Sequence, residues 1–344
     1  MNRIQIIGAG PAGSSAAISA LLHGAPVDLI EKSKFPRHKV CGEFLSPEIV
    51  PVLQRLGVWT AFEQRKPARI ERMELHFGSK PKIARLPEPA YGLSRYEYDR
   101  LLYDRAIELG AQPAQQATPE AMPRIWTAGR RGDRAESRGN RLFGFKAHFN
   151  GPAHDAVELY FFKGCYVGIN CVENGITNVC GLGPERLLTS FNFEIDELVH
   201  SFAPLSARLT SLQRSMKWLN VGPLVFQNHL NQEPEPGVYS AGDALSFVDP
   251  FTGSGLLSAA LTGELAGSYA SQGFTSADHR KACRKALAKP FGISSLLRAV
   301  VRTQWADHLA GLIPGEWLYK LTRPRKSGEC SEEDTRRQAR FHKE

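Results

Sequence analysis

Residues 4–31 read IQIIGAGPAGSSAAISALLHGAPVDLIE, and this stretch decides the fold. The apolar, β-branched run at 4–7 predicts a buried parallel strand. The small-residue stretch at 14–23 predicts a helix, and residues 27–31 predict a second strand. Strand, glycine turn, helix and strand in this order predict a βαβ unit, and hence an α/β fold.

Three glycines in the turn have distinct roles in a nucleotide-binding βαβ unit. Gly8 allows the tight turn, Gly10 lets backbone approach a pyrophosphate, and Gly13 lets the helix pack closely on the strand. Amides of the first helical turn, which includes Pro11 and Ala12, would point toward the phosphates with the helix dipole. The stretch predicts a dinucleotide site, and the alternative is a glycine turn that binds nothing.

The acidic residue at the end of the second predicted strand indicates the type of nucleotide. Glu31 is placed to accept hydrogen bonds from a ribose diol. Its negative charge would repel a phosphorylated 2′ position, so NADP is not expected in this site.

A second glycine motif stands far along the chain, as YSAGDA at 239–244 followed by DPFTGSGL at 249–256. With the first motif, it resembles the flavoprotein family of geranylgeranyl reductases, aromatic-ring monooxygenases and flavin-dependent halogenases. The resemblance implies FAD in a Rossmann-like, glutathione-reductase-type domain, with Asp243 at the ribityl chain and amides of 253–256 at the flavin ring. The residues implied at the cofactor here are Gly242, Asp243, Pro250, Gly253, Ser254, Gly255 and Leu256.

Two further segments extend the resemblance. FPRHKVCGE at 35–43 is similar to the geranylgeranyl reductase segment whose Cys-Gly pair lies beside the flavin, which implies Cys41 as an active-site thiol. The alternative is that Cys41 packs in a tight turn, as free cysteines often do. Lys32, Arg37 and Arg95, the last within GLSRYEYD at 92–99, are also expected at the cofactor. The alternative for the last stretch is a helix capped by Ser94, with Asp99 exposed on the surface.

The resemblance and the local patterns predict a discontinuous organisation. The expected units are an FAD-binding domain (1–140 and 221–275), an antiparallel-sheet substrate subdomain (141–220), C-terminal helices (276–322) and a charged, disordered tail (323–344). Helices are expected at 47–65, 96–109 and 194–215, and from Gly255 onward.

Two stretches depart from the family pattern. Residues 164–170 carry glycine where reductases and halogenases tend to have tryptophan. Residues 111–130 are too few for the usual strands of this region. A catalytically impaired flavoprotein with a binding or interaction role therefore remains the alternative.

Composition and charge argue against nucleic-acid binding, a metal site and secretion. The net charge of +8 is dispersed along 344 residues, so nucleic-acid binding is not expected. The six cysteines show no zinc spacing, so no metal site is expected. With no signal-peptide pattern and no long apolar run, we expect a cytoplasmic protein. Basic helices within 279–308 either rest on an anionic membrane or pack on the domain.

The expected activity is that of an FAD-dependent oxidoreductase with a small hydrophobic substrate, of prenyl, alkyl or aromatic type. NAD(P)H is expected as a transient electron source, because only one nucleotide-binding fingerprint is present. The sequence favours a reductase over a monooxygenase only through Cys41, since a thiol is largely protonated at neutral pH and can donate a proton. It nominates no histidine as a catalytic base and does not indicate the oligomeric state.

Overall fold

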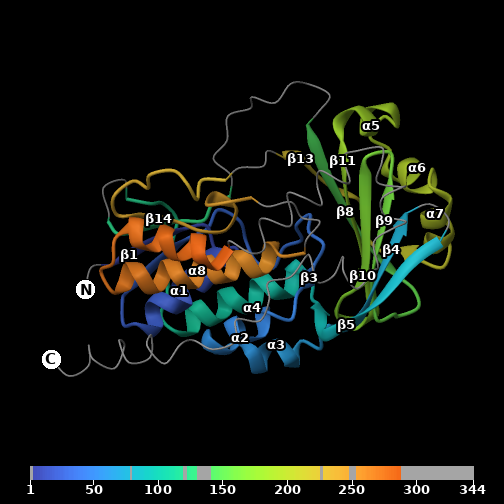
Figure 1. Ribbon diagram of the computed structural model, residues 1–344. Helices are drawn as coiled ribbons and strands as arrows, with labels where there is room; N and C mark the ends of the chain where they lie inside the picture. The colour runs from blue at the N-terminus through green and yellow to red at the C-terminus, as the bar shows by residue number, and fades with distance from the viewer. Residues whose placement is uncertain are drawn as a thin grey trace.

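The computed structural model describes residues 3–77, 80–118, 122–129, 141–224, 228–247 and 253–287. These residues form two sheets with separate helical layers (Figure 1). The smaller sheet and its long helices make one half of the molecule, and the larger sheet makes the other half.

The smaller sheet is wholly parallel, with the strand order β14-β7-β1-β2-β6. Its strands are β1 (Ile4–Ile7), β2 (Val27–Ile30), β6 (Gln112–Ala114), β7 (Arg124–Trp126) and β14 (Val238–Ser240). Helix α1 (Pro11–Leu22) connects β1 to β2, so the predicted βαβ unit is confirmed. Strands β2 and β6 lie on one side of β1, whereas β7 and β14, which come later in the chain, lie on the other side. This reversal of strand order creates the crevice at the strand ends where α/β folds bind ligands.

Helix α1 lies against helix α8 (Gly255–Ser271), and the two pack through small residues. A Cβ on Gly263 would lie 2.1 Å from the Ala12 carbonyl oxygen, and one on Gly267 would lie 2.2 Å from that of Ala16. Glycine at these positions therefore allows the close approach of two backbones. Helix α4 (Arg95–Glu108) also contacts α1.

The helix predicted over 47–65 is instead two helices, α2 (Ile49–Arg55) and α3 (Trp59–Gln64). Gly57 between them has a φ of 66°, a left-handed conformation that ends a helix.

The larger sheet has the order β12-β8-β11-β10-β9-β4-β5-β3, with β13 also on β8. Its strands are β3 (Phe44–Leu45), β4 (Ala68–Phe77), β5 (Lys80–Gly92), β8 (Leu142–Asn150), β9 (Ala156–Phe162), β10 (Cys165–Cys171), β11 (Ile176–Pro184), β12 (Gln213–Arg214) and β13 (Leu219–Leu224). Neighbouring strands are antiparallel except for the parallel pair β4–β9. The predicted antiparallel-sheet character therefore holds for most of this sheet.

Three strands of this sheet, β3, β4 and β5, come from the range predicted for the FAD-binding domain. So does most of β13, beyond the expected boundary at 221. Charged residues and the prolines at 81, 87 and 89 hide the strand pattern of β5. Among the described residues, β3 pairs with only two residues of β5, so most of the outer edge of β5 has no hydrogen-bonded neighbouring strand. Proline, which cannot donate a backbone hydrogen bond, is tolerated at such an edge.

Helices α5 (Glu185–Ser190), α6 (Ile195–His200) and α7 (Ala203–Leu209) cover the face of the larger sheet that points away from the smaller sheet (Figure 1). Side chains of alternate sheet residues, such as Phe145 and Val179, pack with Leu198 and Leu205 in this core. The single helix predicted over 194–215 is thus replaced by α6, α7 and β12. Pro204, in the first turn of α7, favours a new helix start there.

Several expectations reach beyond the described residues. Residues 276–287 are helical, but the rest of the predicted C-terminal helices and the charged tail lie outside the described part, as does Pro250. In the short 111–130 segment, β7 confirms the predicted fragment at 125–126, while β6 was not predicted.

Candidate active site between the two sheets

The glycine loop after β1 has the geometry of a phosphate-binding turn. A Cβ on Gly13 would lie 1.7 Å from the Gly8 carbonyl oxygen, so helix–strand packing itself requires this glycine. Gly10 has an ordinary φ of −68°, and a Cβ there would meet no atom within 4 Å. The space beside Gly10 at the start of α1 therefore fits the pyrophosphate of a dinucleotide.

Glu31 follows the last residue of β2 and lies next to this loop. Its carboxylate accepts hydrogen bonds from the Ala9 and Ser33 amides, each at 2.9 Å, and pairs with Arg37 at 2.9 Å. Burial alone would raise its pKa, but Arg37 and the two amides outweigh burial and lower the pKa to about 2. Glu31 and Arg37 thus both reach the predicted nucleotide site, while Lys32 is exposed to solvent.

We expect Glu31→Gln to destabilise the protein in a pH-dependent way. The folded-state pKa lies below the ordinary value of 4.5, so the ionised carboxylate stabilises the fold. This contribution is complete above about pH 4.5 and is lost as the pH falls toward about 2. Thermal unfolding of both proteins should show a Tm difference near neutral pH that shrinks through this window. A difference that stays constant at every pH would contradict this assignment.

The second glycine motif meets the first in space. Gly242, with a φ of 60°, begins the 3₁₀ turn η2 (Gly242–Ala244), and its Cβ would lie 2.8 Å from that of Ala12 on α1. Its amide donates to Thr262 Oγ1 of α8 at 2.9 Å. Asp243 follows with an exposed side chain. Two motifs that are far apart in sequence therefore lie at one end of the smaller sheet.

The start of α8 carries the remaining residues of this motif. Gly253 has a φ of 63°, and a Cβ there would lie 2.8 Å from the ring of Phe44. Ser254 and Leu256 are buried, and a Cβ on Gly255 would meet no atom within 4 Å. Like Gly10, Gly255 is a helix-start glycine with open space beside it.

Arg95 lies at the start of α4, where Ser94 caps the helix as predicted by accepting the Glu97 amide. The Arg95 guanidinium forms a bidentate ion pair with Asp99, at 2.5 and 2.8 Å. Asp99 is fully buried, which corrects the interpretation of Asp99 as a surface residue. The flavin contact of Arg95 stays a prediction, and the same guanidinium also lies beside the Cys41 thiol.

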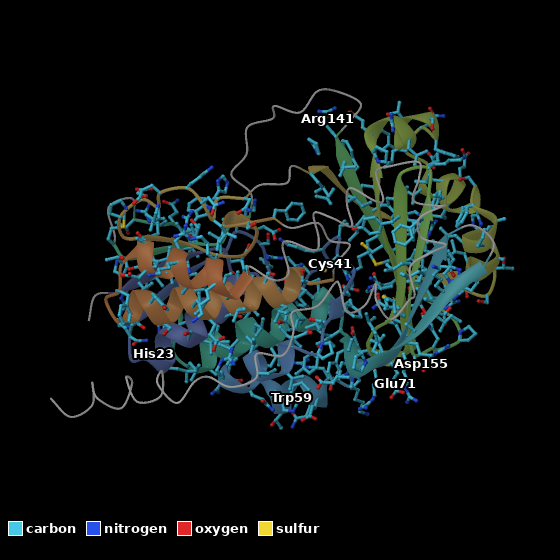
Figure 2. All side chains as sticks on the ribbon, in the orientation of Figure 1. His23, Cys41, Trp59, Glu71, Arg141 and Asp155 are labelled. Carbon is cyan, nitrogen blue, oxygen red and sulfur yellow. The ribbon has the colours of Figure 1, made fainter. Side chains whose placement is uncertain are left out.

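Cys41 lies between the two halves of the molecule, in a loop that is attached to the larger sheet (Figure 2). The Asn178 side-chain amide of β11 donates to the carbonyl oxygens of Cys41 and Gly42, at 3.2 and 2.9 Å. Cys180, on the same strand, has its thiol next to the Cys41 backbone, and burial raises the pKa of Cys180. Cys41 is half-buried, which is compatible both with an active-site thiol and with a residue that packs in a tight turn.

A cluster of charged side chains, which sequence reasoning missed, lies directly beyond this cysteine. The fully buried Glu43 carboxylate contacts the Lys146 ammonium, lies 2.7 Å from His148 Nε2, and accepts the Arg95 amide at 2.6 Å. The His38 ring lies edge-on to that of His148, with 5.1 Å between centroids. The sequence pattern that could have indicated this cluster lies in β8, where the polar residues Lys146 and His148 alternate with apolar core residues.

The electrostatics of this cluster favour an ionised Glu43. Burial opposes ionisation, but His148 and Lys146 outweigh it and lower the pKa of Glu43. The pKa of His38 is also lowered, first by burial and then by Lys146 and His148. The side-chain nitrogen and oxygen atoms of His38, Glu43 and His148 lie within 4.8 Å of one another. The Lys146 charge opposes a cation there.

The same face of the larger sheet becomes apolar away from the cluster. Phe161, Tyr166 and Leu182 stand directly opposite one another on three adjacent strands. They alternate with the helix-facing residues, so their side chains lie on the opposite face. In the next row, Leu159 and Gly168 lead across the sheet to Cys180. An apolar row of side chains, in which Phe161 and Leu182 are buried and Tyr166 is half-buried, therefore adjoins the loop that contains Cys41 and the charged cluster.

Comparisons with known proteins agree with this geometry. Residues 2–124 match the model of a family described as FAD binding domain. The menaquinone reductase of Mycolicibacterium smegmatis is 34% identical over 113 residues, covering 32% of this chain and 27% of that protein. Digeranylgeranylglycerophospholipid reductase 2 of Methanosphaera stadtmanae is 26% identical over 321 residues, covering 81% of this chain and 80% of that protein.

Solved structures share the whole fold at low identity. A flavin-dependent brominase has a TM-score of 0.74 at 16% identity, with 98% of both chains covered. A geranylgeranyl bacteriochlorophyll reductase-like protein from Thermoplasma acidophilum has a TM-score of 0.68 at 16% identity, covering 98% of this chain and 96% of that one. The predicted fold class, an FAD-binding α/β domain combined with a larger sheet, is thereby confirmed.

Within the described residues, the helices are all too short or too polar to span a bilayer.

Proposed function

We propose that the protein is an FAD-dependent reductase that acts on a double bond of a hydrophobic, prenyl-type substrate, because residues 2–124 match the model of the family described as FAD binding domain. The observation that carries this proposal is the face of the larger sheet that meets the Cys41 loop. It combines an apolar row with a compact group of proton-carrying side chains. The similarity to a digeranylgeranylglycerophospholipid reductase over most of both chains supports the same choice.

The residues present fit FAD. The open space at Gly10 would receive the pyrophosphate, and Glu31 would hold the ribose beside it. Asp243 is exposed next to the start of α1 and would hold the ribityl chain. The amides of 253–256 would lie at the flavin ring, where a helix start favours negative charge. Bound FAD would supply the hydride chemistry, with NAD(P)H proposed as the electron donor.

The protein's own contribution would be to orient the substrate and to supply a proton. An apolar prenyl chain would gain by burial against Phe161, Tyr166 and Leu182. The polar side chains near Cys41 and Glu43, at the other end of this sheet face, would determine which part of the prenyl chain reaches the cofactor. The Cys41 thiol is one candidate proton donor at that corner.

Asp243→Ala is expected to weaken FAD retention far more than Cys41→Ser. Only Asp243 is proposed to hold the ribityl chain, whereas Cys41 would lie beside the ring without carrying it. Loss of one hydrogen bond from a charged group costs about 1.5–3 kcal/mol, or roughly 10- to 150-fold in affinity. Titration of apoprotein with FAD measures both variants. Equal affinities would remove the assignment of Asp243.

Anaerobic turnover tests the proposed function. The purified protein would be reduced with NADH or NADPH under nitrogen and mixed with a prenyl alcohol or a prenylated quinone. We expect the flavin absorbance to recover, with a product that has gained two hydrogen atoms at a carbon–carbon double bond. Recovery only after oxygen is admitted, with an oxygen atom in the product, would show a monooxygenase instead.

A further inference from the structure

We propose that Glu43 and His148 form a carboxylate–imidazole dyad that supplies the proton in this reduction, with His148 as the acid and Glu43 as its positioning residue. The proposal rests on the proposed function, because a proton donor has meaning only for a reaction that consumes a proton. It replaces Cys41 with His148 as the proton donor and assigns a role to two buried residues that the sequence did not nominate.

The contact between the two residues determines where the His148 proton lies. An ionised carboxylate can only accept hydrogen bonds, so the 2.7 Å contact makes Nε2 of His148 the donor to Glu43 Oε2. Nδ1 is then the nitrogen that exchanges a proton. A buried carboxylate that fixes the tautomer and ring orientation of a histidine is the arrangement by which enzymes activate an imidazole for proton transfer.

The surroundings of Glu43 hold its carboxylate ionised and in place. Oε1 contacts the Lys146 ammonium and accepts the Arg95 amide at 2.6 Å, while Oε2 is left to His148. Glu43 also has a φ of 52°, an unfavourable backbone conformation for a residue other than glycine. Lys146 from β8 and the Arg95 amide from α4 therefore hold one oxygen of the buried carboxylate, and the other oxygen faces the His148 imidazole.

His38 connects the dyad to solvent. Its exposed ring contacts His148 edge-on and lies 5.0 Å from the Tyr96 ring. The groups that face His148 are thus His38 and Glu43 from the loop that contains Cys41, and Lys146 from its own strand. Asn178 stands opposite it on β11. Glu43 supplies the carboxylate that pairs with the ring.

The proton balance of the step is simple. Saturation of a carbon–carbon double bond adds one hydride and one proton. The hydride comes from the reduced cofactor, and the proton leaves Nδ1 of the His148 imidazolium for the second carbon. Neutral His148 then regains a proton from solvent through His38, while Glu43 stays ionised throughout.

The tautomer of His148 is the first test, and it needs neither substrate nor turnover. Nitrogen-15 NMR of the purified protein at neutral to alkaline pH, with His148→Gln to assign the signal, should show the proton on Nε2. Glu43→Gln should remove this preference, because a neutral amide no longer selects one nitrogen. A proton on Nδ1 in the unchanged protein would overturn the dyad.

The pH dependence of turnover is the second test. With a prenylated quinone as probe, His148→Gln should slow anaerobic reoxidation by about 10²-fold or more and remove one limb of the pH–rate profile. Glu43→Gln should move that limb. The matched control is His154→Gln, a half-buried imidazole beside Glu158 on the helix-covered face, which should leave rate and profile unchanged.

The two tests separate the inference from the proposed function. If the unchanged protein reduces no prenyl probe, the proposed function fails, and the proton-donor role fails with it even if NMR shows the expected tautomer. If the protein turns over but His148→Gln keeps the rate and the full profile with FAD bound, only the dyad's role fails. Partial recovery of a His148→Ala variant by added imidazole would support proton transfer over a structural role.

Discussion

Gly13→Ala is expected to abolish FAD binding and to destabilise the fold, whereas Gly10→Ala should abolish binding alone. A Cβ on Gly13 would lie 1.7 Å from the Gly8 carbonyl oxygen and 2.7 Å from Thr127 Oγ1. Helix α1 would have to move away from β1, and such overpacking typically costs about 1–3 kcal/mol. Gly10 has open space and an ordinary φ, so alanine fits there until a phosphate approaches.

This pair separates packing from ligand binding within one turn. Urea unfolding should give Gly10→Ala a stability close to that of the unchanged protein, and a clear loss for Gly13→Ala. FAD titration should show weak or no binding for both. Tight binding by Gly10→Ala would contradict the position assigned to the pyrophosphate.

The second large effect is expected from Lys146→Met, which removes the buried counter-charge of Glu43. Both side chains are fully buried. Breaking one partner of such a pair leaves an uncompensated buried charge, at a cost of about 3–5 kcal/mol. We expect an equivalent loss in the free energy of unfolding, measured with urea near neutral pH.

The double variant Glu43→Leu with Lys146→Met provides the control. Replacing both charges by apolar groups of similar size is often close to neutral, so much of the stability should return. The loss in Lys146→Met should also shrink as the pH falls, because protonation of Glu43 removes the unpaired charge. A single variant within about 1 kcal/mol of the unchanged protein would show that the pair is not a desolvated one.

The elements set by local chemistry were predictable from sequence. The turn from Gly8 to Gly13, the helix after it and the capping of α4 by Ser94 each depend on residues a few positions apart, and all are observed. These predictions succeeded because the residues that determine each turn, helix or cap lie within the motif itself. That both glycine motifs serve one cofactor was implied only by the family resemblance, and the close approach of Gly242 to Ala12 was not predicted.

The errors concern pairing over long distances. β5 carries three prolines, and the sheet that it joins together with β3 and β4 takes its other strands from residues 142–224, so no local pattern places β5 in that sheet. Glu43 was read only as part of a motif because its partners, Lys146 and His148, come from a strand about a hundred residues later. Burial and partner identity, which made Glu43 central to the site, depend on the tertiary fold.

We infer that this chain holds FAD between Gly10, Glu31 and Asp243. The most direct measurement is the identity of the cofactor released when the purified protein is denatured. We predict a yellow protein whose supernatant contains FAD, in a ratio approaching one per chain after reconstitution. A colourless protein that takes up no FAD on reconstitution, or one that releases FMN, would contradict the account.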